Sequence, residues 1–507
     1  MIENFIQTID QFGLDHPERI VYENNQVKNT YGELREYSNR LANYLDQLNL
    51  DRSRPVMVYG NQKFETLVAF LGAVKSGHAY IPVDSHSPKT RLELIGEIAE
   101  PAALINVEPT DFKINELPTI EPDQLSSIIN EPVEYSVDHA VSSDETYYII
   151  FTSGTTGKPK GVQISHNNLL SFVNWMLSSE FSLPNEPRNL SQPPYSFDLS
   201  VMNWGPTLAS GGTLVALDKE VTDNFKELFN ALPNTKVQVW VSTPTFADVC
   251  LLNPAFNAES MPEITHFLFC GEELTHKTAQ ALRTRFPNAH IFNTYGPTEA
   301  TVAVSAVEIT DEILEKYDRL PIGTPKDDTL MTIVNPTTDE VLSDNEKGEL
   351  IIQGPSVSKG YLNNPEKTEA AFIKDRPRKY RSGDLCARDQ FGQFLFYGRT
   401  DFQVKLHGYR IELEEVSFHL QHQPLVKQGV VVPVYGRDQK VSQLIAWVVP
   451  TKSVVGNELK ATEEIKAGLQ KEMVSYMVPQ RIIYKEELPQ SPNGKIDLKA
   501  IINEVNS

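Results

Sequence analysis

Hydrophobic positions at the start of the chain recur every three or four residues. Ile2, Phe5, Ile6, Ile9 and Phe12 have this spacing. Apolar residues at such intervals are typical of a helix that buries one face and exposes the other. The pattern therefore predicts that the protein opens with an amphipathic helix.

Helical and strand-like patterns then alternate along the chain. Thr30 and Glu33 have the spacing of a capping box, which predicts the start of a second helix. Strand-like runs cover residues 55–59 and 79–83, and a helical pattern covers residues 64–75 between them. This alternation indicates α/β layers around a parallel sheet.

The character of the sequence changes in three later regions. Residues 106–146 are rich in Pro, Asp and Glu with weak periodicity, and we expect loops and short edges there. Short β-like runs between Gly, Pro and Asn predict a β-rich subdomain at about residues 300–400. The predicted fold class is α/β, with a large N-terminal domain (1–400) and a small C-terminal α+β domain (401–507).

Composition narrows the range of partners. The 507 residues carry a net charge of −21, which argues against nucleic acid or an anionic membrane, because both attract basic surfaces. Cys250, Cys270 and Cys386 are far apart and form no metal-spaced pair or disulfide framework. The sequence has no secretory signal and no apolar run of membrane-spanning length, so a cytoplasmic location without membrane insertion is predicted.

A loop rich in glycine, hydroxyls and lysine lies at residues 151–162, between two strand-like runs. Glycines let backbone N–H groups converge on one point, and hydroxyls and lysines add donors and charge, so the loop suits a polyphosphate. It is not the common P-loop, because two residues separate Gly154 from Gly157 and Pro159 follows Lys158. A flexible surface loop is the alternative from composition alone.

Further short patterns follow in a fixed order along the chain. They are residues 30–34, 75–77 with 82–84, 151–162, 197–200, 293–299, 348–350, 380–385, 398–401, 405–412 and 493–497. Each pattern is weak by itself. Together they closely resemble the adenylate-forming enzymes, and among them the amino-acid adenylation domains of nonribosomal peptide synthesis. The resemblance covers nearly the whole chain.

The resemblance implies a reaction in two steps with ATP and Mg²⁺. A carboxylate attacks the α-phosphorus to give an acyl-adenylate and pyrophosphate, and a thiol then displaces AMP. The developing charge on phosphate requires fixed donors and cations. The implied nucleotide-binding residues are Thr152, Ser153, Thr155, Thr156, Lys160, Asn293, Thr294, Tyr295, Gly296, Pro297, Thr298, Glu299, Asp384, Tyr397, Gly398, Arg399 and Lys495, with Glu299 as the metal ligand.

Lys495 has the central catalytic role that the resemblance implies. Its ammonium would bridge the substrate carboxylate and the transferring phosphate, which neutralises and aligns two anions. Asp401 stands at the position of the family's hinge, about which the small domain rotates between the steps. The alternative for Lys495 is an exposed lysine in a turn. The alternative for Asp401 is a simple polar linker.

Asp198 narrows the acid to be activated. In amino-acid adenylating members this aspartate receives the α-ammonium, and a buried carboxylate is costly without a cationic partner. The alternative is a helix N-cap. Cys270 stands where many adenylation domains have a smaller residue, so with Val302 it would restrict the pocket and could set handedness. Its alternative role is a small buried hydrophobe.

No carrier domain follows residue 497, so the thiol acceptor is expected to be a separate molecule. This architecture, with Asp198 and Cys270, resembles the D-alanine–D-alanyl carrier protein ligases. The resemblance implies D-alanine as substrate, a phosphopantetheinylated D-alanyl carrier protein as partner, and a role in D-alanylation of lipoteichoic acid. The alternatives are an adenylation enzyme for another small amino acid, an acyl-CoA ligase, and an inactive ATP-binding regulator.

Overall fold

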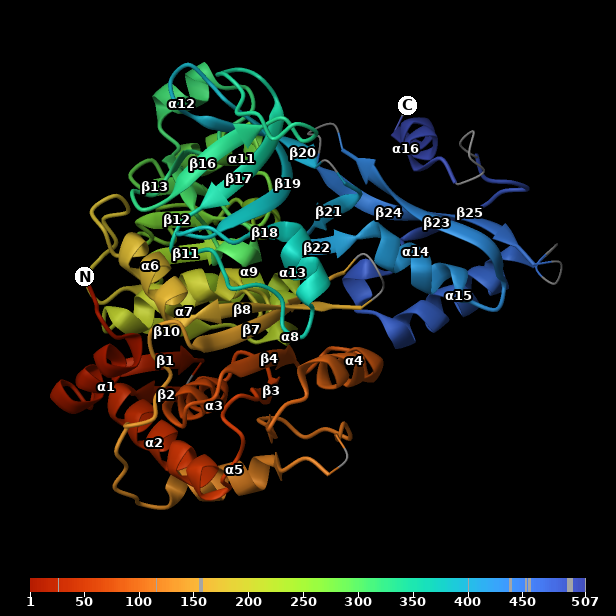
Figure 1. Ribbon diagram of the computed structural model, residues 1–507. Coiled ribbons are helices and arrows are strands. Elements are labelled where there is room, and N and C mark those ends of the chain that lie inside the picture. The colour runs from red at the N-terminus through yellow and green to blue at the C-terminus, as the bar shows by residue number, and fades with distance from the viewer. Residues whose placement is uncertain are drawn as a thin grey trace. The chain divides into compact units, whose positions relative to one another are not determined.

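The computed structural model describes residues 1–25, 27–114, 116–154, 158–399, 401–436, 440–451, 454, 457–489 and 496–506 (Figure 1). By its internal contacts the chain divides into two compact units. The first unit comprises Met1–Ser85, Ala99–Ile150 and Gly161–Gly398, and the second comprises His86–Ile98, Phe151–Lys160 and Arg399–Ser507. The sequence did not indicate that residues 86–98 and 151–160 group with the C-terminal residues. The predicted domains, 1–400 and 401–507, stay a prediction.

Nine described strands of the first unit form one sheet in the order β15-β14-β13-β12-β11-β9-β10-β1-β2. The pairs from β1 through β10, β9, β11 and β12 to β13 are parallel, and the pairs at both edges are antiparallel. Their bounds are β1 Ile20–Asn24, β2 Val27–Thr30, β9 Arg188–Ser191, β10 Thr213–Ala216, β11 Val239–Ser242, β12 His266–Phe269, β13 His290–Tyr295, β14 Ser305–Glu308 and β15 Thr324–Pro325.

The side chains of this sheet alternate between two cores. Val239 and Val241 on β11 belong to the core shared with the six-stranded sheet, whereas Trp240 between them belongs to the core on the opposite face. Successive side chains of a strand point to opposite faces, so a strand that is covered on both faces is apolar throughout. Helices α9 and α11 contribute Leu228 and Leu282 to the second core.

Six further strands form a sheet in the order β6-β5-β3-β4-β7-β8. Their bounds are β3 Val56–Gly60, β4 Tyr80–Asp84, β5 Ala103–Asn106, β6 Thr119–Ile120, β7 Thr146–Thr152 and β8 Lys160–Ser165. The predicted strands at residues 55–59 and 79–83 are confirmed. They pair in parallel as β3 and β4, as expected of strands joined through a helix.

A third sheet confirms the β-rich texture that the sequence shows after residue 300. It has the order β16-β17-β19-β18, and β20 pairs with β19. The bounds are β16 Leu330–Val334, β17 Gly348–Gln353, β18 Phe372–Ile373, β19 Lys379–Arg388 and β20 Phe394–Arg399.

The helices of the first unit begin largely where the sequence signals predict. Thr30 and Glu33 form the expected capping box of α2, and Ser165 caps α6. The bounds are α1 Phe5–Asp15, α2 Tyr31–Gln47, α3 Phe64–Lys75, α5 Pro122–Asn130, α6 His166–Met176, α7 Leu199–Ala209, α8 Lys219–Thr222, α9 Phe225–Thr235, α10 Pro244–Leu251, α11 His276–Arg285, η1 Thr298–Ala300, α12 Asp311–Lys316 and α13 Pro365–Ala371.

The expectation that residues 106–146 form only loops and short edges is wrong for α5. Pro122 occupies the first turn, where its missing N–H costs nothing. Leu125, Ile128 and Ile129 are buried in the main core of the unit. The apolar face of this short helix is therefore stabilised by packing, which the polar surroundings in the sequence concealed.

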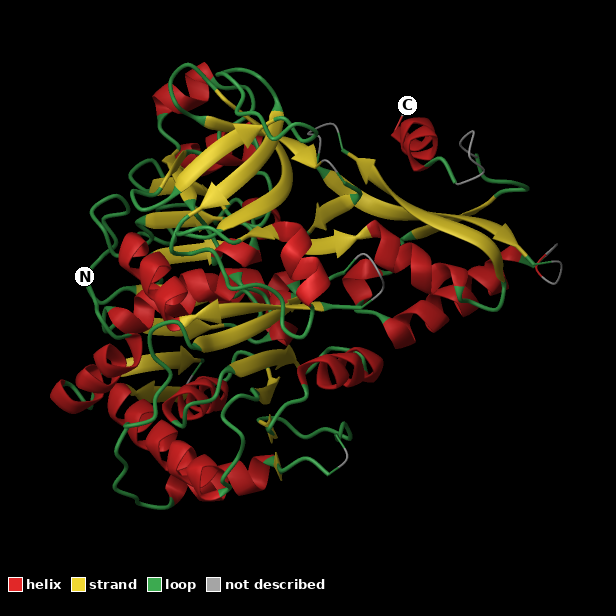
Figure 2. Ribbon diagram, in the orientation of Figure 1, coloured by secondary structure: helices red, strands yellow, loops and turns green. Residues whose placement is uncertain are grey.

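The second unit has a twisted sheet of β23, β24 and β25 with helices on both faces (Figures 1 and 2). Val431 lies in a core with residues of α14 and α15, whereas Val430 and Val432 lie in a core with Ile501 of α16. The bounds are α4 Lys89–Ala99, β21 Gln403–Leu406, β22 Tyr409–Glu412, α14 Leu413–Gln421, β23 Val426–Tyr435, β24 Val441–Pro450, α15 Glu458–Glu472, η3 Ser475–Met477, β25 Arg481–Tyr484 and α16 Leu498–Asn506. Among the described helices, none combines the length and apolar character needed to cross a membrane.

A buried lysine joins the first three helices of the first unit. The Lys75 ammonium lies 2.6 Å from the Asp10 carboxylate and donates to Ser38 and Asn39 at 2.8 and 2.7 Å. Burial lowers the pKa of Lys75, and the Asp10 charge opposes that shift. Removing one member of a buried ion pair leaves the other charge uncompensated.

We expect Lys75→Met to destabilise the protein by about 3 kcal/mol, the low end of the range for broken buried pairs. Thermal unfolding should show a clearly lower midpoint. The matched control is Lys374→Met, which removes an exposed lysine 3.7 Å from Glu369 and should leave the midpoint unchanged. Equal midpoints for both variants would contradict the stabilising role of the Lys75 cluster.

Candidate functional site

Several of the predicted substrate-binding residues of the first unit lie at the carboxyl ends of neighbouring parallel strands. The turn with Asp198 follows β9, Cys270 follows β12 directly, and Thr294 and Tyr295 end β13. These strands are neighbours in the order β13-β12-β11-β9. In open α/β sheets, ligands bind at the carboxyl ends of the strands. The sheet order thus brings together residues that are up to about a hundred positions apart.

Asp198 stands at the N-cap of α7 but makes no capping hydrogen bond with its side chain. It is only 7% exposed. The N-terminus of a helix stabilises negative charge, so the position favours an ionised carboxylate. Burial, and then the charge of Asp198, raises the pKa of the Tyr148 hydroxyl well above its ordinary value. The capping alternative is therefore not supported by the hydrogen bonds of Asp198.

Cys270 and Val302 contact each other. The Cys270 thiol lies 3.7 Å from the Val302 carbonyl oxygen, and both side chains are buried in the same core. Thr301 and Val302 have φ values of 61° and 68°. Such values are rare for β-branched residues, and strained backbone of this kind occurs preferentially at ligand sites. The predicted pair thus borders a constrained turn.

The residues at the end of β13 are held by main-chain contacts. The Asn293 amide donates to the Pro321 carbonyl at 2.7 Å, and the Thr294 hydroxyl donates to the Phe269 carbonyl at 2.9 Å. A Cβ atom at Gly296 would lie 2.5 Å from the Ala303 Cα, so only glycine fits. These contacts fix the backbone that leads to Pro297 and Thr298.

Tyr295 and Asp384 meet, although 89 positions separate them. The Tyr295 hydroxyl donates a hydrogen bond to the Asp384 carboxylate, and both residues are buried. Asp384 lies on β19, where its N–H donates to the Ser382 hydroxyl at 3.0 Å. The structure therefore places two of the implied nucleotide-binding residues side by side.

Glu299 is fully buried within η1. The Tyr361 hydroxyl donates to Glu299 Oε1 at 2.8 Å. An isolated buried carboxylate is costly and requires donors or a cation. Mg²⁺ sites that include substrate phosphates need only one or two protein carboxylates, so Glu299 fits the predicted metal ligand. Thr298 beside it is 8% exposed.

The Gly/Thr loop belongs to the second unit, where its donors contact carboxylates. The Gly154 N–H donates to a Glu415 carboxylate oxygen at 3.0 Å, and the Lys160 ammonium lies 3.7 Å from Glu412. Burial raises the pKa of both glutamates, although neighbouring cations oppose that shift. These contacts show that the loop can hold anionic oxygens, as binding of phosphates requires.

Other loop residues have different environments. Thr152 is buried, and its hydroxyl has no hydrogen-bond partner among the described residues. The Ser153 hydroxyl donates to the Arg410 carbonyl at 2.8 Å. A buried hydroxyl without a protein partner is expected to bind a ligand or water. Thr155, Thr156 and the predicted catalytic Lys495 lie outside the described residues.

Arg399 and Asp401 form a bidentate ion pair at the start of the C-terminal segment. The guanidinium donates to the two carboxylate oxygens at 2.9 and 2.6 Å. Although burial raises the pKa of Asp401, the hydrogen bonds from Arg399 hold it below its ordinary value. In the first unit, the Tyr397 ring, which precedes Gly398, lies 3.8 Å from the Lys347 ammonium. Asp401 as a hinge stays a prediction.

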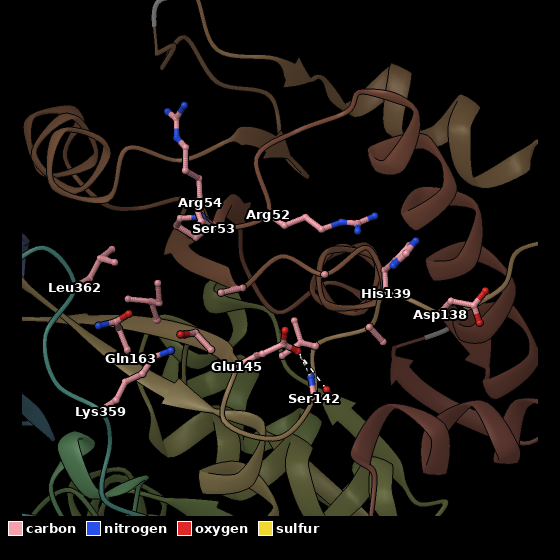
Figure 3. A pocket seen from close by; sticks show the side chains of 17 residues that line it. Arg52, Ser53, Arg54, Asp138, His139, Ser142, Glu145, Gln163, Lys359 and Leu362 are labelled. Carbon is pink, nitrogen blue, oxygen red and sulfur yellow. Dashed lines mark hydrogen bonds between the residues drawn. The ribbon is translucent and has the colours of Figure 1, made fainter.

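A polar pocket of the first unit contains none of the predicted site residues (Figure 3). Its volume is ≈ 590 Å³, and its lining includes Arg52, Arg54, Glu145 and Lys359. Arg54 donates to the carbonyls of residues 100 and 101, and Arg52 pairs with an aspartate at 3.2 Å. Two of its cations are thus engaged in protein contacts.

Comparisons with known proteins decide the family. Residues 9–362 match the family model described as AMP-binding enzyme, and residues 415–495 match the AMP-binding enzyme C-terminal domain. A protein of Lactiplantibacillus plantarum named D-alanine–D-alanyl carrier protein ligase is 57% identical over 507 residues, with 100% of both chains covered. The chain belongs to this family. It is an AMP-forming ligase of the adenylate-forming superfamily.

Another relative agrees with this assignment, and two solved structures share the fold. A Streptococcus agalactiae protein of the same name is 51% identical, with 100% of both chains covered. The fold resembles o-succinylbenzoate CoA synthetase of Bacillus subtilis, with a TM-score of 0.84, 20% identity and 98% of each chain covered. It also resembles the Vibrio cholerae adenylation domain AlmE, with a TM-score of 0.81, 22% identity, and coverage of 100% and 98%. The predicted α/β fold class is confirmed.

Sequence reasoning missed Tyr361, Glu412 and Glu415. Tyr361 follows a glycine in an irregular segment, and nothing in the local pattern separates it from a core aromatic. Glu412 is the N-cap of α14, and Glu415 lies in its first turn, where acidic residues are common and do not indicate a site. Their burial could have been suspected only from the apolar residues that surround them in the sequence.

Proposed function

We propose that the protein uses Mg²⁺ and ATP to convert D-alanine to D-alanyl-adenylate and then transfers the D-alanyl group to a carrier protein. The acceptor is the phosphopantetheine thiol of a separate D-alanyl carrier protein, and the product feeds D-alanylation of lipoteichoic acid. The protein itself acts in the cytoplasm. The 57% identity with a protein named for this activity, over the full length of both chains, is the observation that carries the proposal.

The buried acid Asp198 selects an amino acid over a plain carboxylic acid. An α-ammonium beside Asp198 gains the Coulomb attraction of a site with few competing waters. A substrate without that group would forgo this attraction. Cys270 and Val302 limit the space beside the α-carbon, which favours a side chain no larger than a methyl group.

Two sets of residues would bind ATP. In the first unit, Asn293 and Tyr295 would contact adenine, and Asp384 would accept both ribose hydroxyls. In the Gly/Thr loop, the N–H of Gly154 would donate to a phosphate oxygen, as it does to a carboxylate in this structure. The ammonium of Lys160, which lies 3.7 Å from Glu412 here, would pair with phosphate charge. Once they contact phosphate, such oriented groups stabilise the charge that develops on phosphorus.

Glu299 would hold Mg²⁺ at the phosphates, and Thr298 would contact the α-phosphate. Bound Mg²⁺ supplies positive charge that offsets the phosphate oxygens and polarises the reacting phosphorus. Lys495 would bridge the D-alanine carboxylate and the α-phosphate. The carboxylate oxygen then forms a bond to phosphorus while the bond to pyrophosphate breaks, and the thiol later forms a thioester as AMP leaves.

The function is tested by two assays on the intact protein. Pyrophosphate exchange with D-alanine, L-alanine, glycine and serine should be fastest with D-alanine. The expected preference is about 10-fold or more, since a difference of one methyl group in the pocket is worth ~1–3 kcal/mol. Thioester formation should require the phosphopantetheinylated carrier rather than free coenzyme A. Exchange that prefers another amino acid, or efficient use of coenzyme A, would replace the proposal with one of the alternatives.

A further inference from the structure

Glu299 is held by one short segment of the first unit, residues 356–361, through both main chain and side chain. The Ser358 N–H donates to the Glu299 carbonyl at 2.9 Å, and the Tyr361 hydroxyl donates to the Glu299 carboxylate at 2.8 Å. Next to Glu299, the Thr301 hydroxyl donates to the Ser356 carbonyl at 2.7 Å. The acid and the segment are thus fixed at three points.

Tyr361 is itself fixed on the sides away from Glu299. Its ring meets Phe372 edge-on, with 5.4 Å between the ring centres. Its N–H donates to the Thr368 hydroxyl at 3.0 Å, and its backbone pairs with Val162 on β8. A tyrosine side chain with a packed ring and a bonded backbone has little freedom to reorient. Its hydroxyl is therefore held at one position.

The same segment contacts the strand that leaves the Gly/Thr loop. The Gln163 N–H donates to the Gly360 carbonyl at 3.1 Å, and the Leu362 N–H donates to the Gly161 carbonyl at 2.7 Å. Strand β8 continues directly from Lys160. Residues 356–362 therefore contact both Glu299 and the part of β8 that lies in the first unit.

We propose that Tyr361 is a positioning residue for the reaction, because its hydroxyl orients the Glu299 carboxylate toward the divalent cation. This inference rests on the proposed function, in which Glu299 binds Mg²⁺. A group that donates to a metal-binding carboxylate fixes its direction, and loss of such a group typically costs about 10–100-fold in metal affinity or activity. Tyr361 does not touch the substrate in this role.

The test is Tyr361→Phe, which removes only the hydroxyl oxygen and keeps the ring against Phe372. The matched control is Tyr317→Phe, because the Tyr317 hydroxyl also donates to a carboxylate, that of Asp389, at 2.6 Å. Asp389 has no role in the proposed site. Both variants lose one tyrosine–carboxylate hydrogen bond and are compared with the unaltered protein.

Two readouts separate positioning from a general loss of structure. Binding of Mn²⁺, measured by electron paramagnetic resonance with saturating α,β-methylene-ATP, should weaken about 10-fold in Tyr361→Phe. In pyrophosphate exchange, the Mg²⁺ concentration for half-maximal rate should rise by about the same factor, and excess Mg²⁺ should restore much of the rate. Tyr317→Phe should match the unaltered protein in both assays.

Three outcomes would overturn the inference. They are an unchanged Mn²⁺ affinity in Tyr361→Phe, an equal loss in Tyr317→Phe, and a loss of rate that excess Mg²⁺ does not reduce. Failure of the proposed function is distinct, because the unaltered protein would then show neither amino-acid-dependent exchange nor Mn²⁺ binding with the nucleotide analogue.

Discussion

Asp198→Asn is expected to lower kcat/KM for D-alanine in pyrophosphate exchange by at least ~10²-fold, because the α-ammonium loses its buried counter-charge. Breaking one partner of a buried pair costs about 3–5 kcal/mol, and each ~1.4 kcal/mol corresponds to a factor of ten. The affinity for ATP should change little. Propionate, which lacks the ammonium, should lose nothing, so the ratio of the two substrates reports the charge directly.

The control for this experiment is Asp218→Asn. Asp218 is also a helix N-cap without a capping hydrogen bond, at the start of α8, and it accepts a hydrogen bond from Asn24 at 2.7 Å. Exchange with D-alanine should be unaffected in this variant. An Asp198→Asn protein that activates D-alanine at the normal rate would remove the basis for amino-acid selection by this carboxylate.

Lys495→Ala is expected to reduce adenylation by at least ~10²-fold, judged from the loss of one oriented donor at the developing charge. Thioester formation from D-alanyl-adenylate supplied to the enzyme should persist, because that step does not bring two anions together. Pyrophosphate exchange and transfer to the carrier, measured separately, distinguish the steps.

Lys499→Ala is the matched control for Lys495→Ala, since it removes an exposed lysine four residues further along, on α16. It should leave both steps unchanged. Near-normal pyrophosphate exchange in Lys495→Ala would refute the bridging role, and an equal loss in both steps would show that the lysine is not specific to adenylation.

The buried carboxylates of the second unit show how much the site depends on distant residues. The Gly154 N–H and the Glu415 carboxylate are 261 positions apart in sequence. From its neighbours in sequence alone, Gly154 is typical of a turn, and Glu415 is typical of the acidic first turn of a helix. Only the folded chain reveals that the N–H donor of Gly154 meets the carboxylate of Glu415, and that burial raises the pKa of Glu415.

The sequence by itself determined the alternation of helices and strands, the cap of α2, and the candidate residues. Periodicity and capping depend on neighbours within a few positions, so they can be read without a fold. The helix α5 was missed, because its nine residues lie in a polar region with weak periodicity. Tertiary burial, rather than local helix propensity, stabilises this helix.

Only the tertiary structure decided which of these residues meet. The strand order places the turn with Asp198, Cys270 and Tyr295 at the same end of a sheet, although they lie at the ends of three different strands. The hydrogen bond from Tyr361 to Glu299 joins residues 62 positions apart. Such contacts arise from packing of whole elements and leave no periodic signal, so no local pattern could predict them.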